Sequence, residues 1–444
     1  MGKYFGTDGV RGLANQELTT RIAYRIGRFI GQYPNGKKNR IIIARDTRLS
    51  GEMLLASLVS GITASGSDVY DEGVSTTPSI SYLVKERQFD YGIMISASHN
   101  PFYDNGIKIF SSEGEKLSND IELLIEDYID RIQDDLPVDS NRIGRWFHGK
   151  DLLNDYQRFL MSKITEDLSS LRILVDGANG SASKVVPDLF SKIGLNAEYI
   201  HIVPNGRNIN EQCGSTHLTS LMETIQRKEY DIGLAFDGDA DRLMIVSPDG
   251  ALVDGDAIIY LCACYLKDKG LLKDNKVVIT VMSNLGLKKA LDAKGIQYEI
   301  TTVGDKYVQA KMKELHLSLG GEQSGHIIFL DDLNTGDGIL TAIKVMCIMK
   351  NTGKSLKELL EGLTIYPQKL RNVVVRNKEY VLQHAGLKKL VEDLEKNVLK
   401  GNGRILLRAS GTESLVRVMC EAETNEICNE VVNQLVNYIE DLII

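Results

Sequence analysis

Three short polar runs in the sequence carry side chains that could do chemistry. They are SASHNP at residues 96–101, DGDADR at 237–242 and GGEQSGH at 320–326. Each run follows a stretch of small or apolar residues, such as Ile93 to Ile95, that is typical of a buried strand. Loops held at the ends of rigid strands often carry catalytic groups, so these runs are candidate active-site loops.

The acidic run predicts a divalent metal site. Asp237, Asp239 and Asp241 alternate along the chain, so on an extended backbone their carboxylates would face one side and repel one another without a cation. Mg²⁺ prefers such oxygen ligands and keeps positions open for phosphate oxygens. The alternatives are a surface turn and a calcium loop, but an EF-hand needs Glu where Pro248 stands. Arg242 could pair with Asp241 or bind a phosphate.

The first run offers Ser98 as a phosphate acceptor. His99 is adjacent, and neighbouring residues on an extended chain point in opposite directions, so a hydrolase-type pair is not favoured. A phosphorylated Ser98 would need no strong base, because it would be a leaving group, and its phosphate would be a fourth anionic metal ligand. The alternative is that Ser98 only hydrogen-bonds a turn. Asn105 and Gly106 predict a hairpin turn, after which Lys108 could donate a proton or hold a phosphate.

The third run suits a sugar. Glu322 and Ser324 lie in a glycine-rich bend, where carboxylate and hydroxyl groups can bind sugar hydroxyls. His326 titrates near neutral pH, as a general acid or base would. The alternatives are a structural histidine and glycines that serve tight packing.

A fourth polar run, RASGTESLVR, predicts a phosphate site near the carboxyl terminus. Backbone amides, two hydroxyls and two guanidinium groups together form a nest for a phosphate dianion. A surface turn with an ordinary ion pair is the alternative. The residues are Arg408, Ser410, Gly411, Thr412 and Arg417.

A strand, helix, strand pattern that occurs three times would position the first three runs. The copies are residues 40–73, 171–200 and 276–300. This order predicts βαβ units with largely parallel sheets. In each copy one more strand leads into a polar run, and ligands gather beyond the carboxyl ends of such strands, so we expect one shared cleft rather than three independent turns.

The pattern changes after about Leu363. An apolar strand, a helix from about Glu379 to Leu399 and two strands joined by the fourth polar run predict a small α+β unit. The sequence therefore predicts an α/β protein with three similar α/β domains and a C-terminal α+β domain. The expected boundaries are 1–152, 153–254, 255–366 and 367–444.

Composition limits the class of protein. With 444 residues, 43% hydrophobic and 25% charged, the chain is long enough for several globular domains. A net charge of -8 argues against general binding to nucleic acid or to anionic membranes. The six cysteines form no even framework, which predicts reduced, mostly buried thiols. With no signal peptide and no apolar stretch near the ~20 residues that cross a bilayer, we expect a soluble cytoplasmic protein.

Several other motifs are incomplete. The run TGKS at 352–355 ends like a P-loop, but Ile348 stands where its first glycine belongs. No GxGxxG follows a strand, and no paired Cys or His spacing supports zinc. Kinase, nucleotide-dehydrogenase and zinc-hydrolase functions are therefore not predicted.

Taken together, the runs resemble the α-D-phosphohexomutase superfamily. The resemblance runs from YFGTDGVRG through ISASHNPFYDNGIKIF, FDGDADR, TTVGDKYV and GGEQSGH to RASGTESLVRVM, which covers all four segments. GTDGVRG, PNGRNINEQCGSTH and Gln323 resemble the branch that acts on glucosamine phosphates. Lys306 stands where members often carry Arg, so charge is kept and bidentate geometry is not.

The resemblance implies a four-domain, heart-shaped molecule with a cleft between all four domains. It implies an active form phosphorylated on Ser98, with Mg²⁺ bound by that phosphoserine and the three aspartates. The implied reaction interconverts glucosamine 6-phosphate and glucosamine 1-phosphate through glucosamine 1,6-bisphosphate, a step toward UDP-N-acetylglucosamine and the cell wall. Further residues implied to bind substrate or to assist transfer are Arg11, Lys108, Arg242, Gly304, Asp305, Glu322, Ser324, His326 and the loop from Arg408 to Arg417.

Two alternatives stay open. One is a phosphomannomutase or phosphoglucomutase, which would differ in the sugar phosphate it turns over. The other is a sugar-phosphate sensor without activity, against which the intact Ser98 and aspartate triplet argue. The expected partner is a small sugar phosphate, with neither nucleic acid nor membrane, and relatives suggest a homodimer by analogy.

Overall fold

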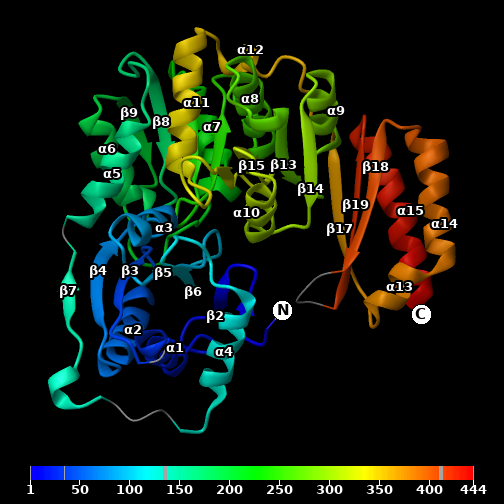
Figure 1. The fold of residues 1–444 in the computed structure, drawn as a ribbon. Helices are drawn as coiled ribbons and strands as arrows, with labels where there is room; N and C mark the ends of the chain where they lie inside the picture. Colours follow the sequence, from blue (N-terminus) through cyan, green and yellow to red (C-terminus); the bar gives the residue numbers. More distant parts are fainter. Residues whose placement is uncertain (1, 35, 134–137, 150, 410–413, 444) are drawn as a thin grey trace. The chain divides into compact units, whose positions relative to one another are not determined.

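The computed structural model describes residues 2–34, 36–133, 138–149, 151–409 and 414–443. Within these residues the chain forms four β-sheets with helices packed on them (Figure 1). The chain divides into two compact units. One comprises Met1–Met282 with Ile296–Glu361, and the other comprises Ser283–Gly295 with Gly362–Ile444. The first three sheets belong to the first unit and the fourth to the second.

The first sheet has the strand order β1-β2-β6-β5-β3-β4-β7. Its central strand β3 has no polar alternation at Ile41 to Ile43, and all three side chains are buried because helices cover both faces. Figure 1 shows α1 and α2 below this sheet and α3 above it. The elements are β1 (Phe5–Gly6), β2 (Gly9–Leu13), α1 (Thr20–Gln32), β3 (Arg40–Arg45), α2 (Gly51–Ala64), β4 (Asp68–Val74), α3 (Thr77–Glu86), β5 (Tyr91–Ile95), β6 (Asp104–Ser111), α4 (Asn119–Asp130), η1 (Ser140–Arg142) and β7 (Trp146–His148).

The second sheet has the order β12-β11-β10-β8-β9. Strands β8, β9 and β10 run parallel, and β11 and β12 add antiparallel strands at one edge. The elements are α5 (Leu152–Ser162), β8 (Arg172–Asp176), α6 (Ala182–Lys192), β9 (Asn196–Ile200), η2 (Gly214–Thr216), α7 (Thr219–Ile225), β10 (Ile232–Phe236), β11 (Leu243–Val246) and β12 (Leu252–Val253).

The third sheet has the order β14-β13-β15-β16. Strand β13 pairs in parallel with both β14 and β15, and β16 is antiparallel to β15. The elements are α8 (Gly255–Asp268), η3 (Lys273–Asn275), β13 (Lys276–Thr280), α9 (Leu285–Ala293), β14 (Gln297–Thr301), α10 (Asp305–Glu314), β15 (Leu319–Gly321), β16 (Ile327–Phe329), α11 (Gly338–Thr352) and α12 (Leu356–Leu359).

The predicted repeat is confirmed. In the first three sheets, β3, β8 and β13 each pair in parallel with the strand that follows the next helix, namely β4, β9 and β14. Each also pairs in parallel with β5, β10 or β15, and these three strands end at the three polar runs. The sheets therefore deliver the candidate loops from equivalent positions.

The predicted hairpin turn at Asn105 and Gly106 is wrong. Both residues lie inside β6, which runs antiparallel to β5 and β2. A Cβ atom at Gly106 would lie 2.4 Å from the carbonyl oxygen of Ser96, so glycine is needed here for the close approach of two backbones. The Asn-Gly pair thus serves packing and not chain reversal.

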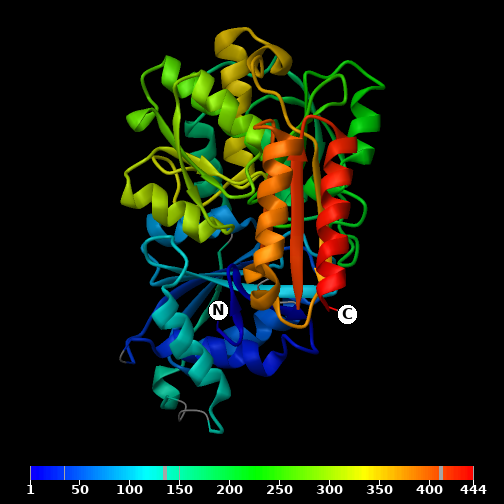
Figure 2. The ribbon, with the colours of Figure 1, turned by 90° about the vertical axis from the view of Figure 1, so that its right-hand side faces the viewer.

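The fourth sheet forms the α+β unit with the order β17-β19-β18. All its pairings are antiparallel, as predicted, and α14 and α15 lie side by side on one face (Figure 2). The single helix expected over 379–399 is interrupted at His384, whose backbone is extended. The elements are β17 (Gln368–Val374), α13 (Lys378–Gln383), α14 (Ala385–Leu394), the π-helical turn η4 (Glu395–Leu399), β18 (Gly403–Ala409), β19 (Leu415–Ala422) and α15 (Asn425–Ile443).

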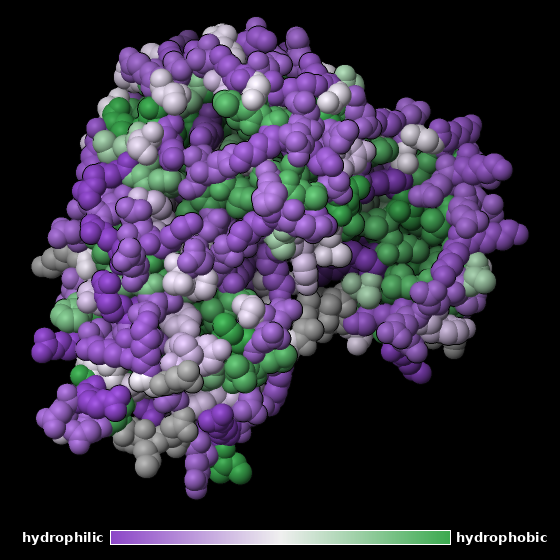
Figure 3. Space-filling model, viewed as in Figure 1, coloured by the Kyte–Doolittle hydropathy of each residue, from purple (hydrophilic) through white to green (hydrophobic). Residues whose placement is uncertain are grey.

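Hydrophilic residues cover most of the face shown in Figure 3. Of the helices in the described chain, none is long and apolar enough to cross a membrane. None of the six cysteines forms a disulfide, as predicted, and all but the half-buried Cys264 are buried.

Candidate active site

Ser98 lies just beyond the end of β5, and its hydroxyl faces the acidic run. Its Oγ donates a hydrogen bond to Asp237 Oδ2 at 2.6 Å. The expectation that Ser98 and His99 point apart is wrong, since Ser98 Oγ lies 3.4 Å from His99 Nδ1. The reason is that Ser98 is not extended: its φ of 53° lies in the left-handed region.

The three aspartates converge on one place, although not in the way predicted. They follow β10 in a turn in which Ala240 has a φ of 57°, so the backbone is not extended. One carboxylate oxygen of each aspartate nevertheless lies within 4.8 Å of those of the other two. All three side chains are buried, and Oδ1 of Asp239 and of Asp241 has no hydrogen-bond partner among the described residues.

Lys108 supplies a positive charge to this group. It projects from β6, and its Nζ lies 2.7 Å from Asp239 Oδ2, 3.2 Å from Asp241 Oδ2 and 2.9 Å from Asp8 Oδ2. Burial acts to lower the pKa of Lys108, but the three carboxylates outweigh it and hold that pKa well above its usual value. The ammonium group is therefore charged at neutral pH.

The pKa values of Asp237 and Asp241 are shifted in opposite directions. Burial, together with Asp241 and Asp239, raises the pKa of Asp237 well above its usual value. Burial also acts on Asp241, but Lys108 and His326 outweigh it and hold its pKa well below that value. A buried set of carboxylates that repel one another and keep free oxygens fits a hard divalent cation.

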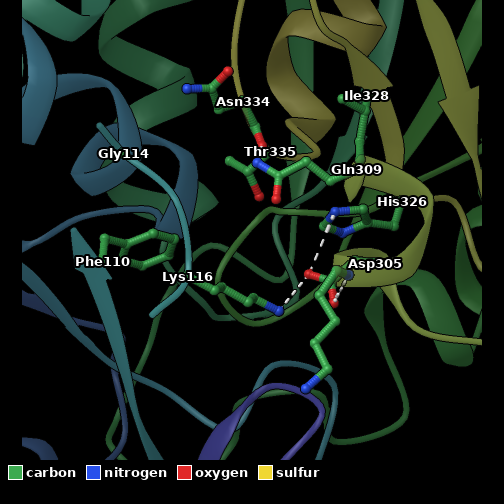
Figure 4. Close-up of a pocket in the computed structure, with 10 residues that line it drawn as sticks. Phe110, Gly114, Lys116, Asp305, Gln309, His326, Ile328, Asn334 and Thr335 are labelled. Carbon is green, nitrogen blue, oxygen red and sulfur yellow. Dashed lines mark hydrogen bonds and ion pairs between the residues drawn. The ribbon is translucent and has the colours of Figure 1, made fainter. Parts of the chain in front are cut away.

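A series of contacts between basic and acidic side chains links the three aspartates to residues that follow strands of the third sheet. Lys116 Nζ lies 2.6 Å from Asp8 Oδ1 and also contacts Asp305, at the start of α10. Asp305 Oδ2 lies 3.8 Å from His326 Nε2, and Figure 4 shows Lys116 and His326 on either side of this carboxylate. His326 Nδ1 lies 3.8 Å from Asp241 Oδ2, so this series of contacts both begins and ends at the aspartates.

His326 is buried and oriented by a backbone contact. Its Nε2 accepts a hydrogen bond from the Gly336 N–H at 3.0 Å, so in a neutral ring the proton lies on Nδ1, toward Asp241. Burial acts to lower the pKa of His326, but Asp241 outweighs it, and the pKa is raised. The ring therefore holds its proton more tightly than a free imidazole.

The other predicted sugar-loop residues lie near by. Glu322 is buried, and its Oε1 accepts a hydrogen bond from the Gly304 N–H at 3.0 Å. Gly304 has a φ of 131°, which glycine adopts without strain. Ser324 is half-buried beside it.

Two arginines reach the same centre. Arg11, from β2, forms an ion pair with Asp8. The backbone N–H of Arg242 donates to Asp237 Oδ1 at 3.2 Å, and its Nε lies 3.8 Å from Asp241 Oδ1. Burial acts to lower the pKa of Arg242, but Asp241 and Asp237 outweigh it and raise that pKa.

The predicted phosphate loop belongs to the second unit. Ser410, Gly411 and Thr412 lie outside the described residues. Arg408 on β18 and Arg417 on β19 are direct cross-strand partners. Neither Nε has a hydrogen-bond partner in the described chain, and burial and Arg417 lower the pKa of Arg408. Two like charges thus face each other without a counter-ion among the described residues.

A second group of possible metal ligands lies at the end of β8. Asp176, His201 and Cys213 offer ligand atoms within 4.8 Å of one another. Asp176 Oδ1 and Oδ2 already accept hydrogen bonds from the N–H groups of Ala178 and Gly214, at 2.8 and 2.9 Å. Burial and Asp176 raise the pKa of the Cys213 thiol to about 12. Because the carboxylate is occupied and the thiol is protonated, we assign this group a structural role in closing the loop after β9.

Sequence reasoning missed three residues of the centre. Asp8 lies inside the quoted GTDGVRG motif and could have been singled out. Thr77 begins α3, and its hydroxyl donates to Asp239 Oδ2; its place after β4 was a usable signal. Lys116 has no such signal, because only the pairing of β6 brings it to Asp8 and Asp305.

Family comparisons match nearly the whole chain. Models of phosphoglucomutase/phosphomannomutase match in four parts: alpha/beta/alpha domain I at residues 2–135, domain II at 151–250, domain III at 254–366 and the C-terminal domain at 370–437. The four parts follow the order of the four sheets.

Curated relatives match over almost their full length. A phosphoglucosamine mutase of Anoxybacillus flavithermus is 48% identical over 436 residues, which cover 97% of each chain. A phosphoglucosamine mutase of Bacillus cytotoxicus is 47% identical over an alignment of 446 positions, gaps included, that covers 99% of each chain.

Solved structures share the fold. A putative phosphomannomutase from Thermus thermophilus matches with a TM-score of 0.81 at 21% identity and covers 98% of each chain. Aspergillus fumigatus N-acetylphosphoglucosamine mutase in complex with GlcNAc-6P and magnesium matches with a TM-score of 0.68 at 18% identity, over 100% of this chain and 96% of the other.

Proposed function

Because the chain belongs to the phosphoglucomutase/phosphomannomutase family, we propose that it interconverts glucosamine 6-phosphate and glucosamine 1-phosphate. The chain is an isomerase of the phosphohexomutase type, and the names of its relatives favour the glucosamine sugar. Its product would supply UDP-N-acetylglucosamine and cell-wall precursors. We keep the domain boundaries at 152, 254 and 366 as part of this proposal.

The observation that carries the proposal is the hydrogen bond from Ser98 Oγ to Asp237 Oδ2 at 2.6 Å. It brings the hydroxyl that would bear the phosphate to the aspartate group. Asp237, Asp239 and Asp241, with a phosphate on Ser98, would hold Mg²⁺, which when bound neutralises the charge of the transferring phosphoryl group. The free oxygens of Asp239 and Asp241 support this assignment.

The proposed cycle begins with a phosphate on Ser98. The bond from phosphorus to Ser98 Oγ breaks as a bond to the free sugar oxygen forms, which gives glucosamine 1,6-bisphosphate. The bisphosphate reorients, and its other phosphate returns to Ser98 Oγ. Lys108 and His326, both buried beside the aspartates, are the candidates for proton transfer. The charged ammonium group of Lys108 would donate a proton to the departing oxygen, and the imidazole of His326 would take the proton of the attacking hydroxyl.

The other predicted residues would hold the substrate. Glu322 and Ser324 would bind sugar hydroxyls, with Gly304 and Asp305 beside them. The loop from Arg408 to Arg417 would bind the phosphate that is not reacting, and Arg11 and Arg242 would face the phosphate on Ser98. These groups position the reactants, which is the main contribution of protein to phosphoryl transfer.

The test is Ser98→Ala, with Ser118→Ala on the exposed start of α4 as the matched control. We expect Ser98→Ala to abolish turnover of glucosamine 6-phosphate without a change in melting temperature, and Ser118→Ala to keep full activity. Full activity in Ser98→Ala would refute the proposal. Turnover of glucose or mannose phosphates above that of glucosamine phosphate would assign the chain to another branch of the family.

A further inference from the structure

The backbone of Ser98 adopts a conformation that a serine does not choose by itself. Its φ of 53° is one that glycine adopts readily and other residues rarely. Such a conformation persists when the surrounding contacts determine it. The carbonyl oxygen of Ser98 shows which contacts these are.

Arg48 binds the carbonyl groups of the Ser98 loop. Its guanidinium group is fully buried just after β3. Nη2 donates to the carbonyl oxygens of Ser98 at 2.9 Å and Asn100 at 2.8 Å. Nη1 donates to that of Asp104 at 3.2 Å and also to that of Pro101. One planar group thus fixes four carbonyls of the chain between β5 and β6.

Asp46 orients Arg48 and extends the network to the Ser98 amide. Asp46 Oδ2 accepts hydrogen bonds from Arg48 Nε at 2.9 Å and from Ser96 Oγ at 2.7 Å. Ser96 Oγ in turn accepts the Ser98 N–H at 2.9 Å. Both polar groups of the Ser98 backbone are therefore held from β3 and its following turn.

Asn210 adds a contact from the loop after β9. Its Nδ2 donates to the carbonyl oxygens of Ser98 at 2.9 Å and Asn100 at 3.0 Å. Gly238, between two of the aspartates, packs on the same carbonyl, because a Cβ there would lie 2.4 Å from Ser98 O. The position of Ser98 is thus fixed from the side of the aspartates as well.

We propose that Arg48, Asp46 and Asn210 form a clamp that positions Ser98 for phosphoryl transfer. They are positioning residues, because they hold the loop backbone and not the reacting oxygen. The clamp turns Ser98 Oγ toward Asp237, where in-line transfer requires it. The inference rests on the proposed function, because it assigns a purpose to the geometry of that same site.

The central variant is Arg48→Lys, which keeps the charge but loses the fork that reaches four carbonyls. Arg28→Lys is the matched control, since Arg28 is also buried and donates to a carbonyl, that of Ala64 at 2.8 Å, away from the loop. We expect Arg48→Lys to lower kcat by about 100-fold with KM within about twofold, because a displacement near 1 Å has that effect. Arg28→Lys should keep kcat within about twofold of the natural chain.

A second measurement is hydrogen exchange of the amides at 96–104. It should be faster in Arg48→Lys than in the natural chain and unchanged in Arg28→Lys. If the natural chain turns over no sugar phosphate, the proposed function fails, and exchange still tests the clamp. If Arg48→Lys has the same kcat and the same exchange rates as the natural chain, the inference is overturned. If that variant does not fold, Asn210→Ala carries the same test, and unchanged kcat and exchange in it would overturn the inference.

Discussion

At the scale of single residues, Lys108 acts as an internal counter-ion. Its ammonium group contacts Asp8, Asp239 and Asp241, and almost none of its surface reaches solvent. When one partner of a buried charge group is removed, the charges left behind destabilise the protein by about 3–5 kcal/mol. The aspartates therefore depend on Lys108 whenever no other cation is bound.

We predict that Lys108→Met lowers the melting temperature and increases the response to Mg²⁺. Without the ammonium group, Asp239 and Asp241 lose the positive charge nearest to both of them, and a divalent cation can replace it. Thermal unfolding with and without MgCl₂ should show a larger stabilisation by Mg²⁺ in this variant than in the natural chain. Activity should be lost as well.

Lys116→Met is the control. Lys116 is a lysine of the same charge network, but it contacts Asp8 and Asp305 and not the aspartate triplet. It should therefore lower the melting temperature without increasing the response to Mg²⁺. Equal Mg²⁺ responses in the two variants would contradict the role of Lys108.

The types and spacing of the residues predicted which groups form the site, but the backbone conformation expected for them was wrong. The spacing of the aspartates and the place of Ser98 after a strand indicated which groups meet. The left-handed backbone of Ser98 and the turn at Ala240 could not be predicted, because non-glycine residues adopt them only under tertiary contacts. Arg48 and Asn210, which supply such contacts, lie 50 and 112 positions from Ser98.

At the scale of elements, the junction of β4 and α3 carries a carboxyl group with a shifted pKa. Burial raises the pKa of Glu72, on β4, from 4.5 to about 7, although Ser75 and Ser79 donate hydrogen bonds to it. Asp71 also raises it. Between pH 4.5 and 7 the folded state therefore binds more protons than the unfolded state, so its stability falls as pH rises through about 7.

We predict that Glu72→Gln removes this loss. Relative to the natural chain, the variant should gain stability between about pH 5 and pH 8, by at most ~3 kcal/mol because part of Glu72 stays in contact with solvent. Urea unfolding at several pH values measures the difference. Glu86→Gln, on the exposed end of α3, should show no such trend. A parallel pH dependence in Glu72→Gln and the natural chain would contradict the assignment.

The strand pair β18 and β19 makes a separate prediction about phosphate. Arg408 and Arg417 face each other directly, and like charges in such positions destabilise a sheet by about 0.2–1 kcal/mol. Arg408→Gln should therefore stabilise the protein slightly in the absence of anions and reduce its stabilisation by inorganic phosphate.

Melting temperatures with and without phosphate test this, with Arg371→Gln on the exposed strand β17 as the control. KM for the sugar phosphate should rise in Arg408→Gln alone. If phosphate raises the melting temperature of Arg408→Gln as much as that of the natural chain, this would count against a phosphate site between these strands.

Elements were predictable where local pattern and tertiary packing agree. The βαβ copies alternate apolar strands with amphipathic helices, and the sheets pair as expected. The Asn-Gly pair at 105 and 106 led to a wrong prediction of a turn. Its glycine is needed because the backbone of Ser96 packs closely against it. The break at His384 lies two residues before Gly386, a residue that weakens a helix and could have indicated the interruption.

At the scale of the whole molecule, the second unit is discontinuous in sequence. It includes Ser283–Gly295, which contains α9, although this segment lies between two strands of the third sheet. Asn284 exchanges hydrogen bonds with the backbone of Tyr366 at 2.9 and 3.0 Å. The backbone N–H of Leu285 donates to Glu421 Oε2 at 2.9 Å. The sequence predicted four consecutive domains. It did not reveal these contacts, because the contacts join residues that are distant along the chain.

We predict that a chain ending at Glu361 is less stable in the part that remains. Truncation removes Tyr366 and Glu421, which hydrogen-bond Asn284 and Leu285, so the melting temperature should fall along with activity. Asn284→Ala in the full chain removes the Tyr366 contacts and the hydrogen bond from the Gly286 N–H, but it keeps the Leu285 contact with Glu421, so it should give a smaller decrease. If the shortened chain melts at the same temperature as the full chain, the segment 283–295 does not depend on residues 362–444.

The same discontinuity affects synthesis on the ribosome. Domains generally fold as they emerge, the N-terminal ones first. Helix α9 leaves the ribosome well before β17, β18 and β19, which belong to its unit, have been translated. Its packing surface must stay uncovered until the final strands are made, so nascent chains stalled before residue 362 should recruit chaperones to this helix.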